Sequence, residues 1–482
     1  MSTPPRTSAP AAPGWAAPGF RIPRPRSPLG GPAVPGRDRG PYVLAGLAFV
    51  AYALLSVLRY RRMETLSWDL GIFEQAIKGY AHLQAPVADL KGPGAHILGD
   101  HFSPITALLA PFYRVFPSPV TLLVAQALLF ALAVVPVTRA ASALLGRSRG
   151  LGIGVAFALS WGVQRAVDFD FHEICFAVPL IAFSLEAVLA RRWRAALLWA
   201  LPLCLVKEDL GFTAAALALL VAYRARHRSP RAAGWALAAA AAGAAVAVLA
   251  FTVVIPAFNS GGDYGYWDKL SQGGPFDGLD TKIRTLLWLL LPTTGALALR
   301  SPLLLAALPT MGWRFLSSED HYWSTDWHYN AVLMPVLALA LAEAIDLSRR
   351  SPRPWLRSYA LQLPAATAAA ALALTAYLPL AALTEPQTYR RSEKVAAAEE
   401  LLARIPAGAS VEADVGPIAR LVTHHRVFWV GDTKGIVPDW IALNNESGWV
   451  EAPVEYAAKL HPGARFTLVG RAGGYVLLKH TG

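Results

Sequence analysis

The sequence is poor in charged residues. Asp, Glu, Lys and Arg make up only 16% of its 482 residues, whereas 55% of them are hydrophobic. Because a soluble domain usually carries about 25% charged residues, this composition excludes an ordinary soluble protein. Several uncharged runs approach the roughly 20 residues that cross a bilayer as a helix. The sequence therefore predicts a polytopic membrane protein.

Cysteine is almost absent, and compact metal-binding motifs are lacking. Cys175 and Cys204 both fall inside apolar runs, so we expect buried thiols that do not indicate a redox compartment. The chain has no HExxH-type motif, which leaves any metal site without a local signature. The sequence shows no internal repeat, and it has no paired Gly- or Pro-broken helices in matching positions of two halves. Both absences argue against a transporter built from two repeats.

The basic residues are clustered. The net charge is +12, but short arginine clusters between apolar runs are typical of the positive-inside pattern, so we expect membrane lipids and no nucleic acid as partners. The apolar runs predict about eleven transmembrane helices, at 41–58, 118–138, 150–166, 172–190, 193–206, 210–223, 232–257, 283–299, 302–316, 328–347 and 355–383.

The polar links between these runs predict the topology. Arginine-rich links such as RRWR (191–194) alternate with acidic links such as DFDFHE (168–173). The alternation requires that 193–223 be two short spans joined at Lys207–Asp209, because one helix would place three charges at mid-bilayer. The N-terminus is then cytoplasmic, and the acidic links and the C-terminus lie outside the plasma membrane. RYRR (59–62) breaks the rule, and we attribute it to snorkelling or ligand binding.

Three regions follow from this pattern. Residues 1–40 are rich in Pro and Arg, which predicts a disordered cytoplasmic tail. Residues 41–386 form the transmembrane domain, with an outer loop at 59–117 that carries amphipathic helices. Residues 387–482 predict a helix followed by short strands in ASVEADV, RVFWV, DWIAL, RFTLVG and GGYVLLKH, hence a small extracytoplasmic α/β domain.

The outer loop begins with LSWDLGIFEQAIKGY (66–80). Its apolar residues follow a helical spacing, which predicts a helix with one apolar face lying on a surface. Asp69, at its start, is either an N-cap with Trp68 and Phe73 as a hydrophobic staple or a functional carboxylate, and the two roles are compatible.

Further ionisable residues gather in the predicted outer links. Asp100 and His101 either cap the helix that starts at Ser103 or serve in metal binding or proton transfer. Two interpretations are open for the remaining links. They are polar loops, closed salt bridges and an interfacial aromatic belt without a further role, or they are parts of one ligand-binding cleft. The candidate substrate-binding residues are His101, Asp168, Asp170, His172, Glu173, Lys207, Glu208, Asp209, His321 and His328.

The motifs LSWDLGIFEQAIKGY, LGDHFSPITALLAPFYRVFPSP, DFDFHEICFAVPLIAFSLEAVL and CLVKEDLGF resemble the DUF2079 family of bacterial membrane proteins over roughly 41–480. That family is similar in layout to the GT-C glycosyltransferases, which use polyprenyl-phosphate sugars and carry an acid just after the first span. Asp69 matches that position, and Asp100 would be a second acid of the same loop. The adjacent acidic pair of protein mannosyltransferases is absent, because Leu70 follows Asp69 and the next acid is Glu74.

The resemblance implies a glycosyltransferase with a GT-C-like arrangement of helices. A lipid-linked sugar would be the donor, and a glycan, lipid or protein of the cell envelope the acceptor. Asp69 would be the general base of an inverting transfer, while Lys207 would neutralise the phosphate, with or without a divalent ion such as Mg²⁺ or Mn²⁺. Asp100 and His101 are the candidate metal ligands. The alternative is a non-enzymatic transporter or lipid-binding protein.

Overall fold

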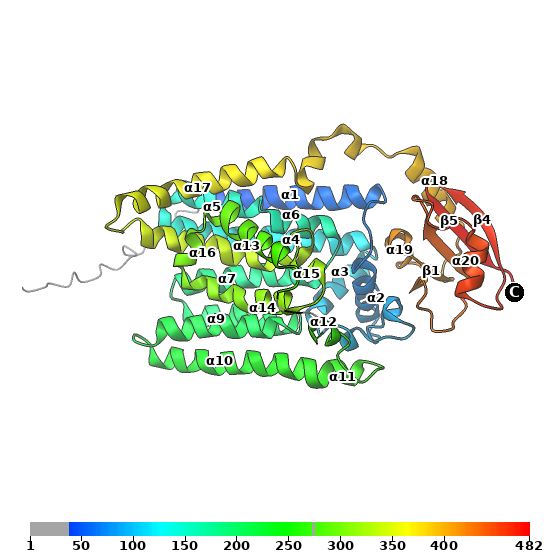
Figure 1. Cartoon of the computed structure of the whole chain (residues 1–482), viewed down its shortest axis with the longest axis horizontal. Coiled ribbons are helices and arrows are strands. Elements are labelled where there is room, and N and C mark those ends of the chain that lie inside the picture. The colour runs from blue at the N-terminus through cyan, green and yellow to red at the C-terminus, as the bar shows by residue number, and fades with distance from the viewer. Residues whose placement is uncertain (1–37, 272–273, 275) are drawn as a thin grey trace, which may run out of the picture. The chain divides into compact units, whose positions relative to one another are not determined.

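The structure is a computed structural model that describes residues 38–271, 274 and 276–482. The predicted tail (1–40) lies almost entirely outside the described residues. From Gly40 to Gly482 the chain forms one compact unit, in which a helical bundle is followed by a small sheet (Figure 1).

The bundle is built from helices of very different length. Its principal members are α1 (Gly40–Arg61), α4 (Pro119–Leu145), α5 (Arg147–Ala158), α6 (Trp161–Phe169), α7 (Ala177–Leu189), α8 (Trp193–Ala200), α9 (Leu210–Ala225), α10 (Pro230–Leu249), α13 (Leu279–Thr294), α14 (Leu308–Leu316), α16 (Met334–Ser348) and α17 (Pro354–Thr375). Shorter helices at the loops are α2 (Leu70–Ala81), α3 (Ala110–Val115), α11 (Ile255–Phe258), α12 (Asp268–Ser271) and α15 (Asp320–Trp323).

Five helical stretches among the described residues are long and apolar enough to cross a membrane: Gly40–Arg61, Pro119–Leu145, Arg147–Phe169, Pro230–Phe258 and Asp320–Ser348. Other predicted runs are broken into shorter pieces; 172–190, for example, divides into a 3-10 turn, η4 (Glu173–Phe176), and α7. The count of about eleven spans therefore stays a prediction.

The chain turns between 193–206 and 210–223, at the three charged residues 207–209. After α8 a 3-10 segment, η5 (Leu201–Leu205), ends the first piece, and α9 starts at Leu210 and packs against α8. Helices α9 and α10 then cross closely at Gly211 and Gly243. A Cβ atom on Gly211 would lie 2.6 Å from the carbonyl oxygen of Gly243, so only glycine fits this crossing.

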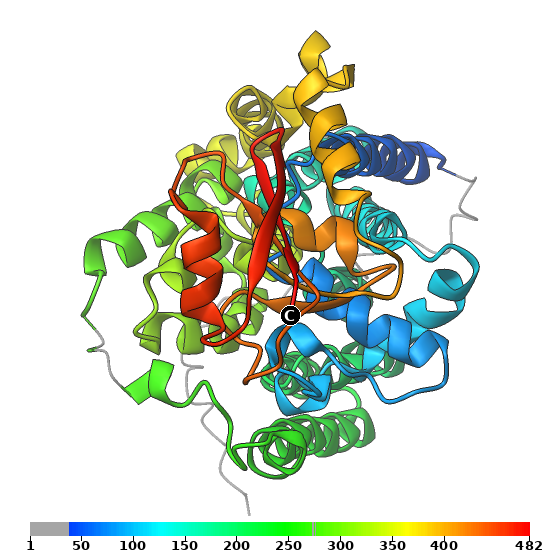
Figure 2. The same cartoon turned by 90° about the vertical axis from the view of Figure 1, so that its right-hand side faces the viewer.

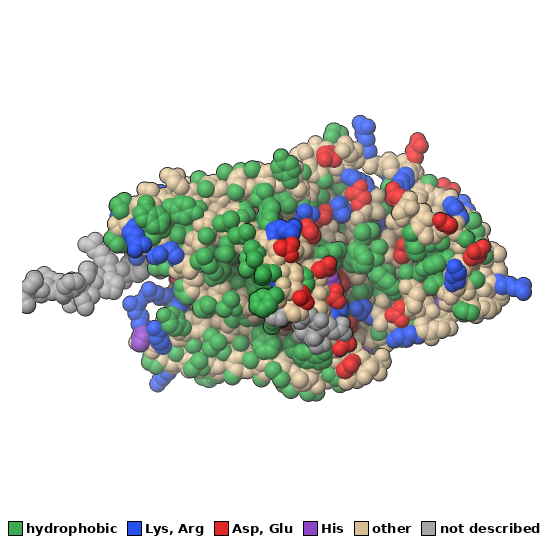
Figure 3. All heavy atoms as spheres, viewed as in Figure 1, with side chains coloured by type: hydrophobic (Ala, Val, Ile, Leu, Met, Phe, Trp, Pro, Cys, Tyr) green, Lys and Arg blue, Asp and Glu red, His purple; other side chains and the backbone are tan. Residues whose placement is uncertain are grey.

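On the face seen in Figure 3, one end of the bundle shows Lys and Arg side chains without acids, whereas acidic and basic side chains are mixed toward the sheet. The arginine-rich segments follow the C-terminal ends of α7, α9 and α16, whereas the acidic and aromatic loops precede the N-terminal ends of α2, α9 and α16. The alternation that the sequence predicts is thus reproduced in the ends of these helices.

The C-terminal segment forms a five-stranded sheet in the order β2-β1-β3-β5-β4 (Figure 2). Strand β1 is parallel to β2 and β3, and β5 is antiparallel to β3 and β4. The strands are β1 (Ser410–Ala413), β2 (Arg426–Trp429), β3 (Trp440–Asn444), β4 (Phe466–Ala472) and β5 (Tyr475–His480). Each overlaps a stretch that the sequence predicts to be a strand, and β3 and β4 extend beyond the predicted ends.

Alternation along the central strands builds a core on each face of this sheet. In β3, Trp440 and Ala442 join the core beneath α18 (Glu393–Leu402) and α19 (Val415–Leu421), whereas Ile441 and Leu443 join the core beneath α20 (Pro453–Leu460). This is the two-residue period expected of a strand covered on both faces.

Helix α2 is not a surface helix, which corrects the sequence-based expectation. Leu70 and Phe73 pack into the core of the bundle, and Ile72 and Ala76 pack into the core of the C-terminal sheet domain. The predicted helix with apolar spacing is present, but other parts of the protein cover it on two sides. The segment that exposes an apolar stripe is instead 108–116, which includes Phe112 at 62% exposure.

The first loop also covers an edge of the sheet. Strand β2 has a neighbour on one side only. On its free side the side-chain amide of Gln75 donates to the carbonyl of Val427 at 2.8 Å, and Arg426 pairs with both carboxylate oxygens of Asp89 at 2.8 and 3.0 Å. Helix α2 therefore connects the bundle to this domain.

Candidate functional site

A cavity of about 920 Å³ lies where α2, the 207–209 turn and the 317–329 loop meet. Its ionisable lining residues are Asp69, His101, His172, Lys207, Glu208, Asp209, Lys269, Asp320 and His321. Its aromatic lining residues are Trp68, Phe169, Phe212, Phe251, Tyr264, Tyr266, Trp267, Trp313, Tyr322, Trp327 and Tyr329. The structure thus brings together side chains from six of the links that the sequence marks as polar.

One wall of the cavity is apolar and reaches the outer surface of the bundle. It is formed by Phe212 of α9, by Val248 and Thr252 near the end of α10, and by Pro309 of α14. Val248 is 49% exposed on the candidate membrane span Pro230–Phe258. A π-helical turn at Ala250–Val254 widens the helix beside this wall. The cavity therefore joins a charged interior to a surface that would face lipid.

Asp69 lies at the start of α2 but does not cap it. Its side chain makes no capping hydrogen bond; instead Asp170 Oδ2 accepts from the backbone N–H of Asp69 at 2.9 Å and of Leu70 at 3.1 Å. Ser67 Oγ accepts from Gly71 N–H at 2.7 Å. Asp69 therefore occupies the N-cap position of α2 without capping the helix through its side chain, and it lines the cavity.

Asp170 is a buried structural partner and is not in the cavity lining. Burial and the nearby Asp69 raise the pKa of Asp170, although the backbone N–H groups of residues 68–70 lower it. Gln126 of α4 holds the same segment, since its Oε1 accepts from the backbone N–H of His172 at 3.1 Å and its amide donates to the carbonyl of Asp170.

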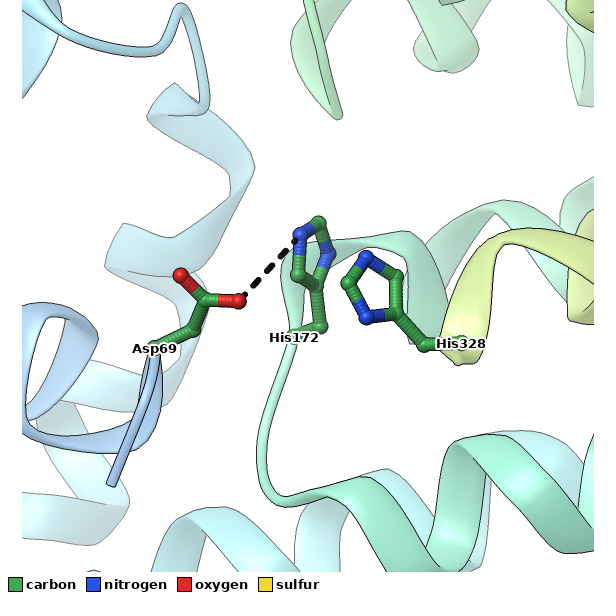
Figure 4. Close-up of side chains that lie close together, drawn as sticks. All are labelled: Asp69, His172 and His328. Carbon is green, nitrogen blue, oxygen red and sulfur yellow. Dashed lines mark ion pairs between the residues drawn. The ribbon is translucent and has the colours of Figure 1, made fainter. Parts of the chain in front are cut away.

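His172 faces Asp69 with one ring nitrogen (Figure 4), and its other ring nitrogen lies next to the buried carboxylate of Glu173. Its Nε2 is 3.9 Å from Asp69 Oδ2, and its Nδ1 is 2.8 Å from Glu173 Oε2. Glu173 in turn pairs with Lys207 Nζ at 2.9 Å. Glu173 is fully buried and does not line the cavity, so it contacts the groups that do.

His328 stacks on His172, with ring centroids 3.8 Å apart and an angle of 29° between the planes. It is 2% exposed, and neither ring nitrogen has a hydrogen-bond partner among the described residues. Asp69, His172 and His328 each offer a ligand atom, and these atoms lie within 4.8 Å of one another. His321 and His328 do not share a helix, because His321 lies in α15 and His328 begins a separate 3-10 turn, His328–Leu333.

Asp100 and His101 belong to a second charged network. His101 Nδ1 is 3.1 Å from Glu208 Oε1, and Asp100 pairs with Lys91 Nζ at 3.0 Å and accepts from the hydroxyl of Tyr266 at 3.1 Å. Burial alone would raise the pKa of Asp100, but the charges of His101 and Lys91 hold it below its ordinary value. His101 lines the cavity, and Asp100 lies behind it.

The Lys207–Asp209 turn combines the two roles that the sequence left open. Glu208 accepts from Phe102 N–H and from the Tyr264 hydroxyl, both at 3.1 Å. Asp209 Oδ2 accepts from Trp313 Nε1 at 2.8 Å, while its Oδ1 has no partner among the described residues. Burial raises the pKa of Asp209 to about 6, although the nearby lysine lowers it. The turn is paired within the protein and also lines the cavity.

The 317–329 loop is shaped by a buried guanidinium that the sequence analysis missed. Arg314 is fully buried, and it donates to the carbonyls of Tyr322 at 2.8 Å and Ser324 at 3.2 Å, and to Asn330 Oδ1 at 3.0 Å. A single arginine inside the apolar run 302–316 was the available signal. Arg314 holds the loop that supplies His321 and its aromatic neighbours to the cavity.

Asp168 lies away from the cavity lining and pairs with Arg59 at 2.9 Å. Arg62 of the same RYRR segment pairs with Glu64. The basic cluster RYRR (59–62), which departs from the predicted charge pattern, is therefore paired with acidic residues. This pairing is a reason for its position beside the acidic loops.

Comparisons with known proteins agree with this architecture. The model of a family described as "Predicted membrane protein (DUF2079)" matches residues 59–460. The chain is similar to the crystal structure of ArnT from Cupriavidus metallidurans bound to undecaprenyl phosphate, with a TM-score of 0.54 and 14% identity over 92% of this chain and 98% of that one. Its apo state gives a TM-score of 0.48 and 14% identity over 91% and 97%. No curated protein matches the chain. ArnT is a GT-C glycosyltransferase, and the likeness shows a shared fold.

Proposed function

The chain belongs to the DUF2079 family of predicted membrane proteins, and we propose that it transfers a sugar from a polyprenyl-phosphate donor to an acceptor outside the membrane. The fold shared with ArnT supports a membrane glycosyltransferase. We further propose about eleven spans, a cytoplasmic N-terminus, and an extracytoplasmic position for both the cavity and the C-terminal domain, in keeping with the arginine-rich opposite end.

The observation that carries the proposal is the mixed character of the cavity. Asp69, His172 and Lys207 line one part, while Phe212 and Val248 line a wall on the lipid-facing surface. A soluble sugar nucleotide has no long apolar chain that would pack against such a wall. A lipid-linked sugar fits both parts, because its head group needs polar partners while its tail remains among apolar ones.

The proposed reaction is a direct displacement at the anomeric carbon. The acceptor oxygen forms the new glycosidic bond, the bond from carbon to the phosphate oxygen breaks, and the configuration inverts. Polyprenyl phosphate leaves with the bonding electrons. Asp69 takes the acceptor proton, which requires a carboxylate within about 2.6–3.2 Å of the hydroxyl. Lys207 and Lys269, both in the lining, stabilise the charge of the leaving phosphate.

The second charged network has an orienting role in this proposal. His101 faces the cavity and is fixed by Glu208 and Asp100, so it would hold an acceptor or donor hydroxyl in place. The C-terminal domain, which contacts α2 next to Asp69, would present a cell-envelope acceptor. These groups supply positioning, which can account for several kcal/mol of a barrier.

The test is transfer by the purified full-length chain in lipid nanodiscs. We would incubate it with a panel of polyprenyl-phosphate sugars and measure release of free polyprenyl phosphate. Asp69→Asn should lower release by at least about 100-fold, and Asp280→Asn, an exposed acid on α13, should leave it unchanged. Release that survives Asp69→Asn, or uptake without release, would refute the proposal and favour a transporter.

A further inference from the structure

We propose that Asp69, His172 and His328 bind a zinc ion at the edge of the cavity. The three side chains come from the start of α2, the link before η4 and the turn before α16, and they point toward one another (Figure 4). Their ligand atoms lie within 4.8 Å of one another. The ion's role in transfer rests on the proposed function, whereas binding of the ion does not.

The first independent observation is the state of His328. Both of its ring nitrogens are buried without a hydrogen-bond partner among the described residues. An imidazole in that state forfeits the hydrogen bonds that it makes in water, and such groups in native proteins are usually satisfied by a partner, a water or an ion. A metal bond to one nitrogen would remove part of that cost.

The second observation is the support behind His172. Glu173 Oε2 lies 2.8 Å from Nδ1 of His172, on the side away from Asp69, and Lys207 fixes Glu173 from behind at 2.9 Å. Nδ1 also accepts from the backbone N–H of Ile174 at 3.3 Å, and Glu173 Oε2 has no hydrogen-bond partner among the described residues, so Glu173 acts on the ring through its charge. A negative charge beside a histidine raises the basicity of the ring, which favours its binding to a cation.

The donor set selects the ion. Two imidazole nitrogens and one carboxylate oxygen suit Zn²⁺, whereas Mg²⁺ prefers oxygen ligands and keeps several waters. Zinc bonds of about 2.0–2.2 Å require the three groups to close by roughly an ångström. No hydrogen bond to a described residue opposes this movement of His328, although its ring would have to shift within its stack on His172.

Three protein ligands leave zinc one open position, the usual arrangement of a catalytic site. Asp69 and His172 both line the cavity, so that position would face the substrate and accept an oxygen. The oxygen belongs either to the donor phosphate or to the acceptor hydroxyl. Asp69 Oδ2 faces His172 and would bind the ion, which leaves the other carboxylate oxygen for the acceptor proton.

The direct test is the metal content of the full-length chain, purified without a histidine tag. After loading with ZnCl₂ and gel filtration, the wild type should retain about one zinc per chain. His328→Ala and His172→Ala should retain less than a tenth of that. His321→Ala is the matched control, since His321 lines the same cavity but lies outside the trio, and it should retain zinc as the wild type does. Equal retention by all four proteins, or none by the wild type, would overturn the site.

A second set of measurements guards against misfolding and separates the two proposals. Zinc should raise the unfolding temperature of the wild type and of His321→Ala but not of His328→Ala, and Glu173→Gln should weaken zinc binding by about 10–100-fold. A change in the visible spectrum of the Co²⁺-loaded protein with inorganic phosphate identifies the phosphate as the open-site ligand, and a change with glycerol only identifies a hydroxyl. If zinc binds but no donor is turned over, the proposed function fails and the site stands.

Discussion

Asp170 holds the start of the helix on which Asp69 sits, across 101 residues of sequence. Its Oδ2 accepts from the backbone N–H groups of Asp69 at 2.9 Å and Leu70 at 3.1 Å. Usually a helix is capped by the residue that begins it. Here the cap comes from the segment that also carries His172, so one carboxylate fixes two walls of the cavity relative to each other.

The first prediction concerns this cap. Asp170→Ala removes the acceptor and leaves two buried N–H groups without a partner, which should destabilise the protein by about 1–2 kcal/mol. It should also lower the turnover number by up to about 100-fold, since a small misplacement of a catalytic group has a large effect on rate. Asp170→Asn keeps an acceptor oxygen and should restore most of the activity. Turnover and unfolding temperature would be measured together, and equal losses for Asn and Ala would contradict the capping role.

A second prediction addresses the apolar wall. Val248→Trp fills the lipid-facing side of the cavity and should raise KM for a long-chain polyprenyl donor by about tenfold, which corresponds to roughly 1.4 kcal/mol. A donor with a single isoprene unit should be unaffected. The control is Leu237→Trp on the same helix, where the side chain is 54% exposed and outside the cavity lining. A similar KM change for long and short donors would place the tail elsewhere.

The third prediction concerns the buried pair of Lys207 and Glu173, which are 2.9 Å apart. Lys207→Met leaves the carboxylate without its cation and should reduce the free energy of unfolding by about 3–5 kcal/mol. Adding Glu173→Gln to the same protein should recover much of that loss, because it removes the buried carboxylate that lost its cation. Thermal unfolding in nanodiscs measures both. Equal unfolding temperatures for the single and the double variant would show that the unpaired charge of Glu173 does not cause the loss of stability.

The fourth prediction is a pH dependence at Glu74 of α2. Burial raises the pKa of Glu74 to about 7 from an ordinary 4.5, even though Thr423 and Tyr113 donate hydrogen bonds to it. The folded state therefore holds a proton that the unfolded state releases between those two values. Stability should fall as pH rises from about 4.5 to 7, by about 3 kcal/mol, and then level off.

Glu74→Gln is the matched control for this effect. It keeps the volume and an acceptor oxygen but has no proton to lose, so the difference in unfolding free energy between the two proteins should change across that interval and stay constant above it. Denaturant unfolding at pH 5 and pH 8 is the measurement. Parallel pH profiles for the two proteins would show that Glu74 does not carry the dependence.

Much of the fold could be predicted because it depends on local patterns. Low charge, long apolar runs and arginine clusters indicated a membrane bundle, and short apolar stretches separated by turn residues indicated the five strands. The turn at 207–209 followed from the energetic cost of charges in a bilayer. These features can be predicted from the sequence because a few neighbouring residues determine each of them.

The rest depends on contacts between distant segments. The apolar face of α2 was visible in the sequence, but a second core behind Ile72 and Ala76 was not, so the helix was expected on a surface. Likewise Asp170 and Glu173 were expected to meet the substrate, whereas they lie outside the cavity lining and support Asp69 and His172. Composition and spacing identify chemically capable residues, but only the fold distinguishes those that face a cavity from those behind them.

The covered edge of the sheet bears on how the C-terminal segment could exist alone. Gln75 and Asp89 of the first loop engage the free side of β2. Separated from that loop, the domain would present a bare strand, which is a template for intermolecular pairing. A truncated fragment should therefore self-associate, so the sheet domain is better regarded as dependent on the first loop than as an independent module.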